Sequence, residues 1–156
     1  PLFSALIGVG APDGFLSLLE ADGSGFVYST FLGGWEFDEV RAFLGGDPKP
    51  PNFVIHQAGA VIGVCLGLGW NPRADGEPCE VWVGRKGDQP KWGIKLAETR
   101  GPLPVYVRRT EGGKWFYNGL YEVTSHTTDP NVIRPRLLPP KIVAIDRLVF
   151  LKRCAV

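Results

Sequence analysis

The chain has 156 residues, 44% of them apolar and 21% charged, with a net charge of +1, 21 glycines and 14 prolines. These values describe an ordinary globular protein with short strands and tight turns. They exclude a transmembrane protein, because no apolar run approaches the roughly eighteen residues of a membrane span. The chain contains no methionine, so we expect residues 1–156 to be a single domain excised from a larger protein.

The small net charge hides an uneven distribution along the chain. Residues 1–56 hold seven acidic groups against two basic ones, whereas residues 85–156 hold six acidic groups against fourteen basic ones. A basic C-terminal half suits a surface that faces phosphate groups. A solvated basic face balanced by an acidic face would give the same count.

The first third of the chain predicts few regular elements. Phe15–Leu19 suits a short helix or a strand, and Phe26–Phe31 suits a strand. Phe37–Leu44 has helical spacing and is followed by Gly45-Gly46, a typical C-terminal stop.

From Phe53 onwards, strands dominate the prediction. The expected strands are Phe53–His56, Gly63–Leu68, Cys79–Val83, Val105–Arg109 and Trp115–Thr124, the last two forming a hairpin. The other expected segments are a short helix at Trp92–Glu98, an irregular stretch at Ile133–Pro140 and a closing strand or helix at Ile142–Lys152. This pattern predicts an α+β fold, mainly β, with a curved sheet or barrel and a few flanking helices.

The reactive residue types indicate neither a catalytic centre nor a metal site. Cys65, Cys79 and Cys154 are widely spaced and lack zinc-site pairing, so we expect reduced thiols in an intracellular protein. His56 lies in an apolar run and is expected to be hydrogen-bonded in the core, and His126 lies in a polar segment after the hairpin. Without a nucleophile–base pair or a phosphate-binding loop, we expect a binding domain that is not an enzyme and has no cofactor.

Two tryptophans beside glycines form the most informative pattern. Leu66-Gly67-Leu68-Gly69-Trp70 is followed, after a loop rich in Asp, Arg and Pro, by Val81-Trp82-Val83-Gly84. Glycine lets a flat ligand approach closely, and paired aromatic faces suit a stacking pocket for a planar base. The alternative is that both indoles lie in the core, since tryptophan is highly buried on average.

The order and spacing of these motifs resemble those of the SRA (SET- and RING-associated, YDG) domain, a PUA-like fold that reads modified cytosine in DNA. Trp70, the loop at 71–81 and Trp82-Val83-Gly84 follow the family's pattern, and Tyr117-Asn118-Gly119 is similar to its Tyr-Asp-Gly motif. The segments between them that add to the resemblance are Asp88-Gln89, Gly93–Ala97 and Pro104–Arg108. The resemblance covers about residues 33–153.

The resemblance implies a pocket for an extruded cytosine base. It places Trp70 and Trp82 as the two stacking walls, and Val83 where the family contacts the substituent on C5. Val83 suits a core strand equally well. The backbone groups expected to complete the pocket are those of Gly67, Leu68, Gly69 and Gly84.

The exocyclic amine of cytosine needs an acceptor, which the family supplies three residues after the first aromatic. Here that position is Arg73, and arginine only donates hydrogen bonds. Either the role passes to Asp75, Asn71 or Glu77, or the ligand differs from that of the family. We favour Asp75, because a turn with the following glycine re-aims its side chain, although a plain surface turn is an equally good interpretation.

Phosphate contacts are expected from Arg85, Lys86, Arg108 and Arg109. Residues 108 and 109 alternate faces on a strand, so only one of them should reach the backbone. The segments at 58–63 and 85–87 are shorter than the loops with which family members enter a duplex. They are therefore poor wedges for flipping a base.

The sequence thus predicts a domain that binds DNA containing 5-methylcytosine or a related base. Such a domain would serve as the recognition module of a modification-dependent nuclease or a chromatin protein. One alternative is a PUA-like RNA-binding module that uses the same basic surface without a base cage. Another is a protein-interaction domain whose tryptophans all lie in the core. The exact modification, the flanking bases and the oligomeric state stay open.

Overall fold

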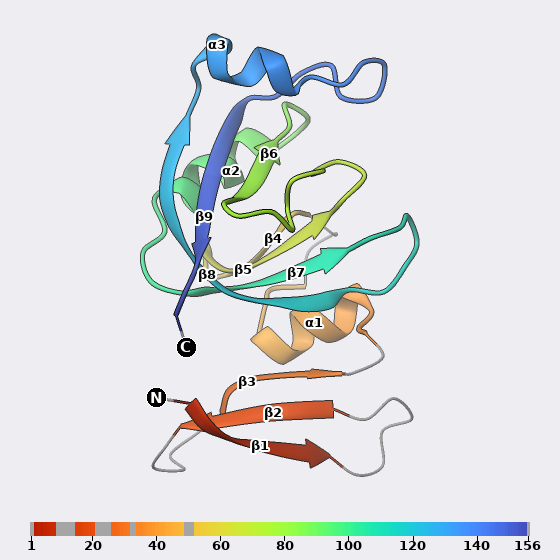
Figure 1. Cartoon of the computed structure of the whole chain (residues 1–156), viewed down its shortest axis with the longest axis vertical. Helices are drawn as coiled ribbons and strands as arrows, with labels where there is room; N and C mark the ends of the chain where they lie inside the picture. Colours follow the sequence, from red (N-terminus) through yellow and green to blue (C-terminus); the bar gives the residue numbers. More distant parts are fainter. Residues whose placement is uncertain (1, 9–14, 21–25, 32–33, 49–51, 156) are drawn as a thin grey trace.

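The structure is a computed structural model that describes residues 2–8, 15–20, 26–31, 34–48 and 52–155. Within these ranges it contains a six-stranded sheet, a separate three-stranded sheet and three short α-helices (Figure 1). The larger sheet is curled into a half-barrel. The prediction of an α+β fold, mainly β, with a curved sheet and a few flanking helices is confirmed.

The three-stranded sheet is formed by the N-terminal strands β1 (Leu2–Gly8), β2 (Phe15–Glu20) and β3 (Phe26–Phe31). They pair antiparallel in chain order. Of the two alternatives for residues 15–19, the strand is the one found, and β3 matches its predicted bounds. Strand β1 was not predicted, because the sequence around it is rich in small residues and glycine.

The six-stranded sheet has the order β4-β5-β7-β8-β9-β6. Its strands are β4 (Val54–Gln57), β5 (Ala60–Gly67), β6 (Cys79–Val83), β7 (Leu103–Arg108), β8 (Phe116–Thr127) and β9 (Arg147–Arg153). Only β5 and β7 are parallel. Each predicted strand in this region is therefore present, and the closing segment at 142–152 is a strand whose start moves by five residues, whereas the other ends move by up to three.

The curl of this sheet is concentrated in the 12-residue strand β8. Its first half pairs with β7 and its second half with β9, and Tyr121 has a partner on each side. Gly119 has a φ of 132°, a backbone conformation that other residues rarely adopt. The register also shifts between Val123 and Ser125, and such irregularities bend a strand.

The helices begin and end where local sequence allows. Helix α1 (Phe37–Leu44) has the predicted bounds and ends at Gly45, whose φ of 76° is left-handed. Helix α2 (Gln89–Ala97) begins at Gln89 rather than Trp92, because proline is well tolerated in a first turn. Helix α3 (Pro130–Ile133) was not predicted, and the stretch predicted to be irregular, 133–140, contains a 3₁₀ turn at 134–136.

Alternating side chains of β5 and β6 divide the buried residues into three clusters. On β5, Val64 and Leu66 pack toward α2, while Cys65 joins α1. On β6, Val81 and Val83 belong to the α2 cluster, while Trp82 faces the opposite side. There it packs under the segment at 130–146, which we call the cap segment, together with Ile133, Ile142, Ile145 and Leu148.

The contact between α2 and β6 gives a test of this packing. Alanine in place of a mid-helix glycine normally favours the helix by about 1 kcal/mol. A methyl group on Gly93, however, would lie 2.6 Å from Cγ1 of Val83, which is fully buried. We therefore expect Gly93→Ala to lower the free energy of unfolding by about 1–3 kcal/mol in urea denaturation.

The same experiment has an internal control. Val83→Ala removes the atoms that the new methyl group would meet, so the double variant should lose less stability than the sum of the two single variants. A Gly93→Ala protein as stable as the original chain would show that α2 does not pack on β6 in this way.

Candidate functional site

Trp70 lies at the surface, in the loop that connects β5 to β6. Its backbone N–H and that of Asn71 donate to the carbonyl of Gly67 over 3.1 and 2.9 Å, so the loop turns sharply as soon as β5 ends. The Trp70 residue is 51% exposed. Nζ of Lys141 lies 4.6 Å from the centre of its ring. A large aromatic face is thus held at the surface beside an ammonium group.

Trp82 has very different surroundings. It is only 8% exposed and packs under the cap segment, against Ile133, Ile142 and Leu148. Its backbone N–H donates to Oδ1 of Asn71 over 2.7 Å. The structure therefore does not bring Trp70 and Trp82 together as two open, facing walls. For Trp82 it corresponds to the alternative in which the indole belongs to the core.

The remaining residues of the expected base pocket are mostly structural in this conformation. Val83 is fully buried against α2, which is the core-strand alternative. Asn71 is 6% exposed, and its side chain is engaged by the backbone of β6. Leu68 is partly buried against the main core. The glycines at 67 and 69 border charged side chains, whereas Gly84 lies against Gln89 of α2.

Asp75 lies beside a residue that was expected to bind phosphate. Its Oδ2 accepts a hydrogen bond from Nη1 of Arg109 over 3.3 Å, and the two side chains are 36% and 69% exposed. Asp75, the carboxylate favoured as the acceptor for the base, thus contacts Arg109, a predicted phosphate ligand that follows β7. Glu77 is exposed in the same loop.

Several cationic groups surround the loop that carries Trp70. Arg108 pairs with Gly67 across β7 and β5, and its guanidinium lies 4.8 Å from the ring centre of Trp115. A Cβ on Gly69 would lie 2.9 Å from Nζ of Lys141. We call Trp70, Arg108, Arg109 and Lys141 together the Trp70 surface.

The other two predicted phosphate ligands, Arg85 and Lys86, are exposed in the connection from β6 to α2. Lys86 lines a separate cleft at the start of α2. The structure therefore places the four predicted phosphate ligands on two connections of the chain. Lys141 belongs to neither and was not predicted, because it lies between the stretch expected to be irregular at 133–140 and the closing element expected at 142–152.

Glu80 is a buried carboxylate that sequence reasoning missed. Its two oxygens accept from Nε and Nη2 of Arg136 over 2.7 and 3.1 Å. They also accept from Nε1 of Trp82 over 3.0 Å and from Nη1 of Arg73 over 3.3 Å. An acidic residue inside an otherwise apolar strand was the only signal in the sequence.

The environment of Glu80 favours its charged form. Burial alone would raise the pKa of this carboxyl, but the hydrogen bonds from Arg136, Trp82 and Arg73 and the charge of Arg136 outweigh burial. The net effect is a pKa below the ordinary value of 4.5. Arg136 in turn donates to the carbonyl of Val132 over 2.8 Å. The ion pair therefore attaches the cap segment to β6.

The described residues give no sign of a metal centre. They contain no group of three or more His, Cys, Asp and Glu side chains arranged to hold an ion. Cys65 and Cys79 are buried free thiols, and burial raises the pKa of Cys79 to about 12, so it stays protonated at neutral pH. None of the helices in the described ranges has the length and apolar character needed to cross a membrane.

Comparison with known proteins gives no relative. No protein-family model matches the chain. No curated protein and no solved structure matches it significantly either.

The Glu80 ion pair can be tested through stability. Glu80→Gln leaves the Arg136 guanidinium, whose side chain is 16% exposed, without its counter-charge. We expect this change to cost about 3 kcal/mol of unfolding free energy at neutral pH. Glu77→Gln, which removes an exposed carboxylate from the preceding loop, is the matched control and should cost less than about 0.5 kcal/mol.

The same pair predicts a pH dependence with a definite sign. Because the folded-state pKa of Glu80 is depressed, its contribution is complete above the unfolded value of 4.5 and is lost as pH falls through the folded value. The stability advantage of the original chain over Glu80→Gln should therefore shrink below pH 4.5. Equal stabilities at neutral pH would show that the carboxylate does not anchor the cap segment.

Proposed function

We propose that this chain is a nucleic-acid-binding domain that uses the Trp70 surface. The observation that carries the proposal is a half-exposed indole with Lys141 on its face and two arginines at the adjoining end of β7. Exposed aromatic rings stack on bases, and flanking cations contact the phosphates on either side.

Within that class, we propose DNA carrying a modified cytosine as the ligand, bound without catalysis. The resemblance to SRA domains supports this choice, because Trp70 occupies the position of the family's first stacking residue. Such a function would require an intracellular location. The ammonium of Lys141 covers the Trp70 ring in the free protein, so it would have to move from the ring to a phosphate as a base stacks.

The position of Trp82 favours a second candidate. Its indole is covered by the cap segment, so in the described conformation the Trp70 ring is a single platform and not one wall of a closed cage. A single platform with adjacent cations also suits a single strand of RNA, as in the PUA-like RNA-binding alternative. Duplex and single-stranded oligonucleotides, as DNA and RNA and with cytosine or 5-methylcytosine, distinguish the two candidates.

Trp70→Ala tests the stacking role. Base–aromatic stacking is worth roughly 1–3 kcal/mol per base, so affinity should fall about 5- to 150-fold, as measured by fluorescence anisotropy. Trp70→Phe should retain part of the affinity. Phe116→Ala, which removes another exposed aromatic residue (44% exposed), is the matched control. A folded Trp70→Ala protein with unchanged affinity would contradict the proposal.

Trp82→Ala does not serve as a second test of stacking. Removing a buried tryptophan from a core cluster costs about 3–5 kcal/mol of stability. Lost binding in that variant would therefore report on the fold as much as on the site.

Asp75 and Arg109 predict how base and backbone recognition are divided. If Asp75 accepts from the exocyclic amine of cytosine, Asp75→Ala should reduce discrimination between 5-methylcytosine and thymine about 5- to 150-fold, since an unpaired donor costs roughly 1–3 kcal/mol. Asp75→Asn should keep part of this discrimination.

Arg109→Gln should instead weaken binding to all sequences alike and lower the salt slope of binding by about one. Competition binding at several salt concentrations measures both effects. If Asp75→Ala discriminates between the two bases as well as the original chain does, another group accepts the hydrogen bond from the base.

A further inference from the structure

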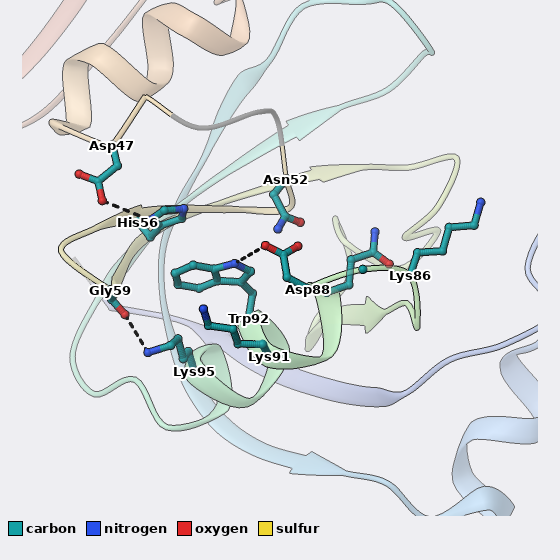
Figure 2. Close-up of a pocket in the computed structure, with 11 residues that line it drawn as sticks. Asp47, Asn52, His56, Gly59, Lys86, Asp88, Lys91, Trp92 and Lys95 are labelled. Atoms are coloured by element: carbon teal, nitrogen blue, oxygen red, sulfur yellow. Dashed lines mark hydrogen bonds and ion pairs between the residues drawn. The ribbon is translucent and has the colours of Figure 1, made fainter.

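A cleft of about 550 Å³ lies where α2 begins, beside the β4–β5 hairpin (Figure 2). The Trp92 indole forms part of its lining, and the ring of His56 stacks on it with centroids 4.1 Å apart and planes inclined by 14°. The two rings are largely buried, and the accessible lining combines polar and apolar atoms. The polar side chains are Asp47, Asn52, Lys86, Asp88, Gln89, Lys91 and Lys95.

Two lysines of α2 converge on the same indole. Nζ of Lys91 lies 5.3 Å from the centre of the Trp92 ring, and Nζ of Lys95 lies 5.6 Å from it. These residues are one helical turn apart, a spacing at which like charges destabilise a helix. Lys95 also donates to the carbonyl of Gly59 over 3.2 Å. Two ammonium groups are thus held beside the same indole ring.

The carboxylates of the cleft do not neutralise these lysines. Oδ2 of Asp47 accepts from the backbone N–H of Ala58 over 3.1 Å and lies 3.5 Å from Nδ1 of His56. Oδ2 of Asp88 accepts from Nε1 of Trp92 over 3.1 Å. Across the part of the chain that the structure describes, no carboxylate lies within 4.0 Å of Nζ of the three lysines of the cleft.

The cleft is therefore lined by three ammonium groups that lack a carboxylate partner among the described residues. Its volume falls within the range of small-ligand sites, which is roughly 300–1,000 Å³. A phosphate group is the anion that such a cluster suits, because lysine binds phosphate as a point charge and two lysines can share its oxygens. The amide side chains of Asn52 and Gln89 can hydrogen-bond the organic part of the ligand.

We propose that this cleft binds a phosphate group, with Lys91 and Lys95 as its main ligands and Lys86 at the far side. The phosphate belongs either to a small phosphomonoester or to the backbone of a bound nucleic acid. The proposal does not depend on the role of Trp70, because the Trp70 loop and the β4–β5 turn lie at opposite ends of β5.

The first experiment uses small ligands and no nucleic acid. Inorganic phosphate, 5′-dCMP and the uncharged nucleoside deoxycytidine are titrated by calorimetry, with the indole N–H resonance of Trp92 as a local NMR reporter assigned through Trp92→Phe. We expect the two phosphates to bind and to shift this resonance, and deoxycytidine to do neither. Lys91→Gln and Lys95→Gln should each weaken binding about tenfold. Lys152→Gln, at an exposed position of β9, is the charge-matched control and should have no effect.

The second experiment identifies a nucleic-acid source of the phosphate. If the small ligands do not bind, Lys91→Gln combined with Lys95→Gln should still weaken oligonucleotide binding and lower its salt slope by about one to two, relative to Lys152→Gln. Trp70→Ala should leave phosphate and 5′-dCMP binding unchanged, so failure of the Trp70 proposal would be seen separately. Cleft variants that match the Lys152→Gln control in both experiments would overturn the proposal.

Discussion

The buried carboxylate of Glu80 decides which aromatic rings this protein exposes. Removing an ion from water costs several kcal/mol, and here that cost is offset only because two guanidinium groups and an indole N–H converge on the same two oxygens. Arg136 reaches Glu80 from the cap segment, 56 residues away in the chain. As a result the cap segment lies over β6, the Trp82 indole is buried, and Trp70 is left with an open face.

Much of the fold follows from local sequence signals. Apolar runs between glycine and proline predicted the strands of the large sheet, and Gly45 fixed the end of α1 through its left-handed backbone. Proline, by contrast, was not used as a signal for the start of a helix. In α2 and α3 it lies in the first turn, where its missing N–H costs nothing, so α2 began earlier than predicted and α3 was missed.

The candidate site was less predictable, because its arrangement depends on contacts between distant segments. Motif spacing identified Trp70, Arg108, Arg109 and Lys86 as surface groups, and the structure exposes each of them at least partly. It could not reveal that residues 130–146 cover Trp82, nor that Asp75 and Arg109 meet. The count of basic residues indicated a charged C-terminal half. It did not indicate that these charges divide between the Trp70 surface and the cleft beside Trp92.

The double pairing of β8 has a consequence for the way the domain opens. The hydroxyl of Tyr121 accepts a hydrogen bond from Nη2 of Arg153 on β9 over 3.0 Å. The backbone of Tyr121 also pairs with Leu103 of β7. Neither half of the sheet can separate without breaking the ladder on one side of this shared strand. Slow amide exchange should therefore concentrate at the centre of β8, whose protons would be released only when the whole sheet unfolds. This central strand therefore holds the two halves of the sheet in register.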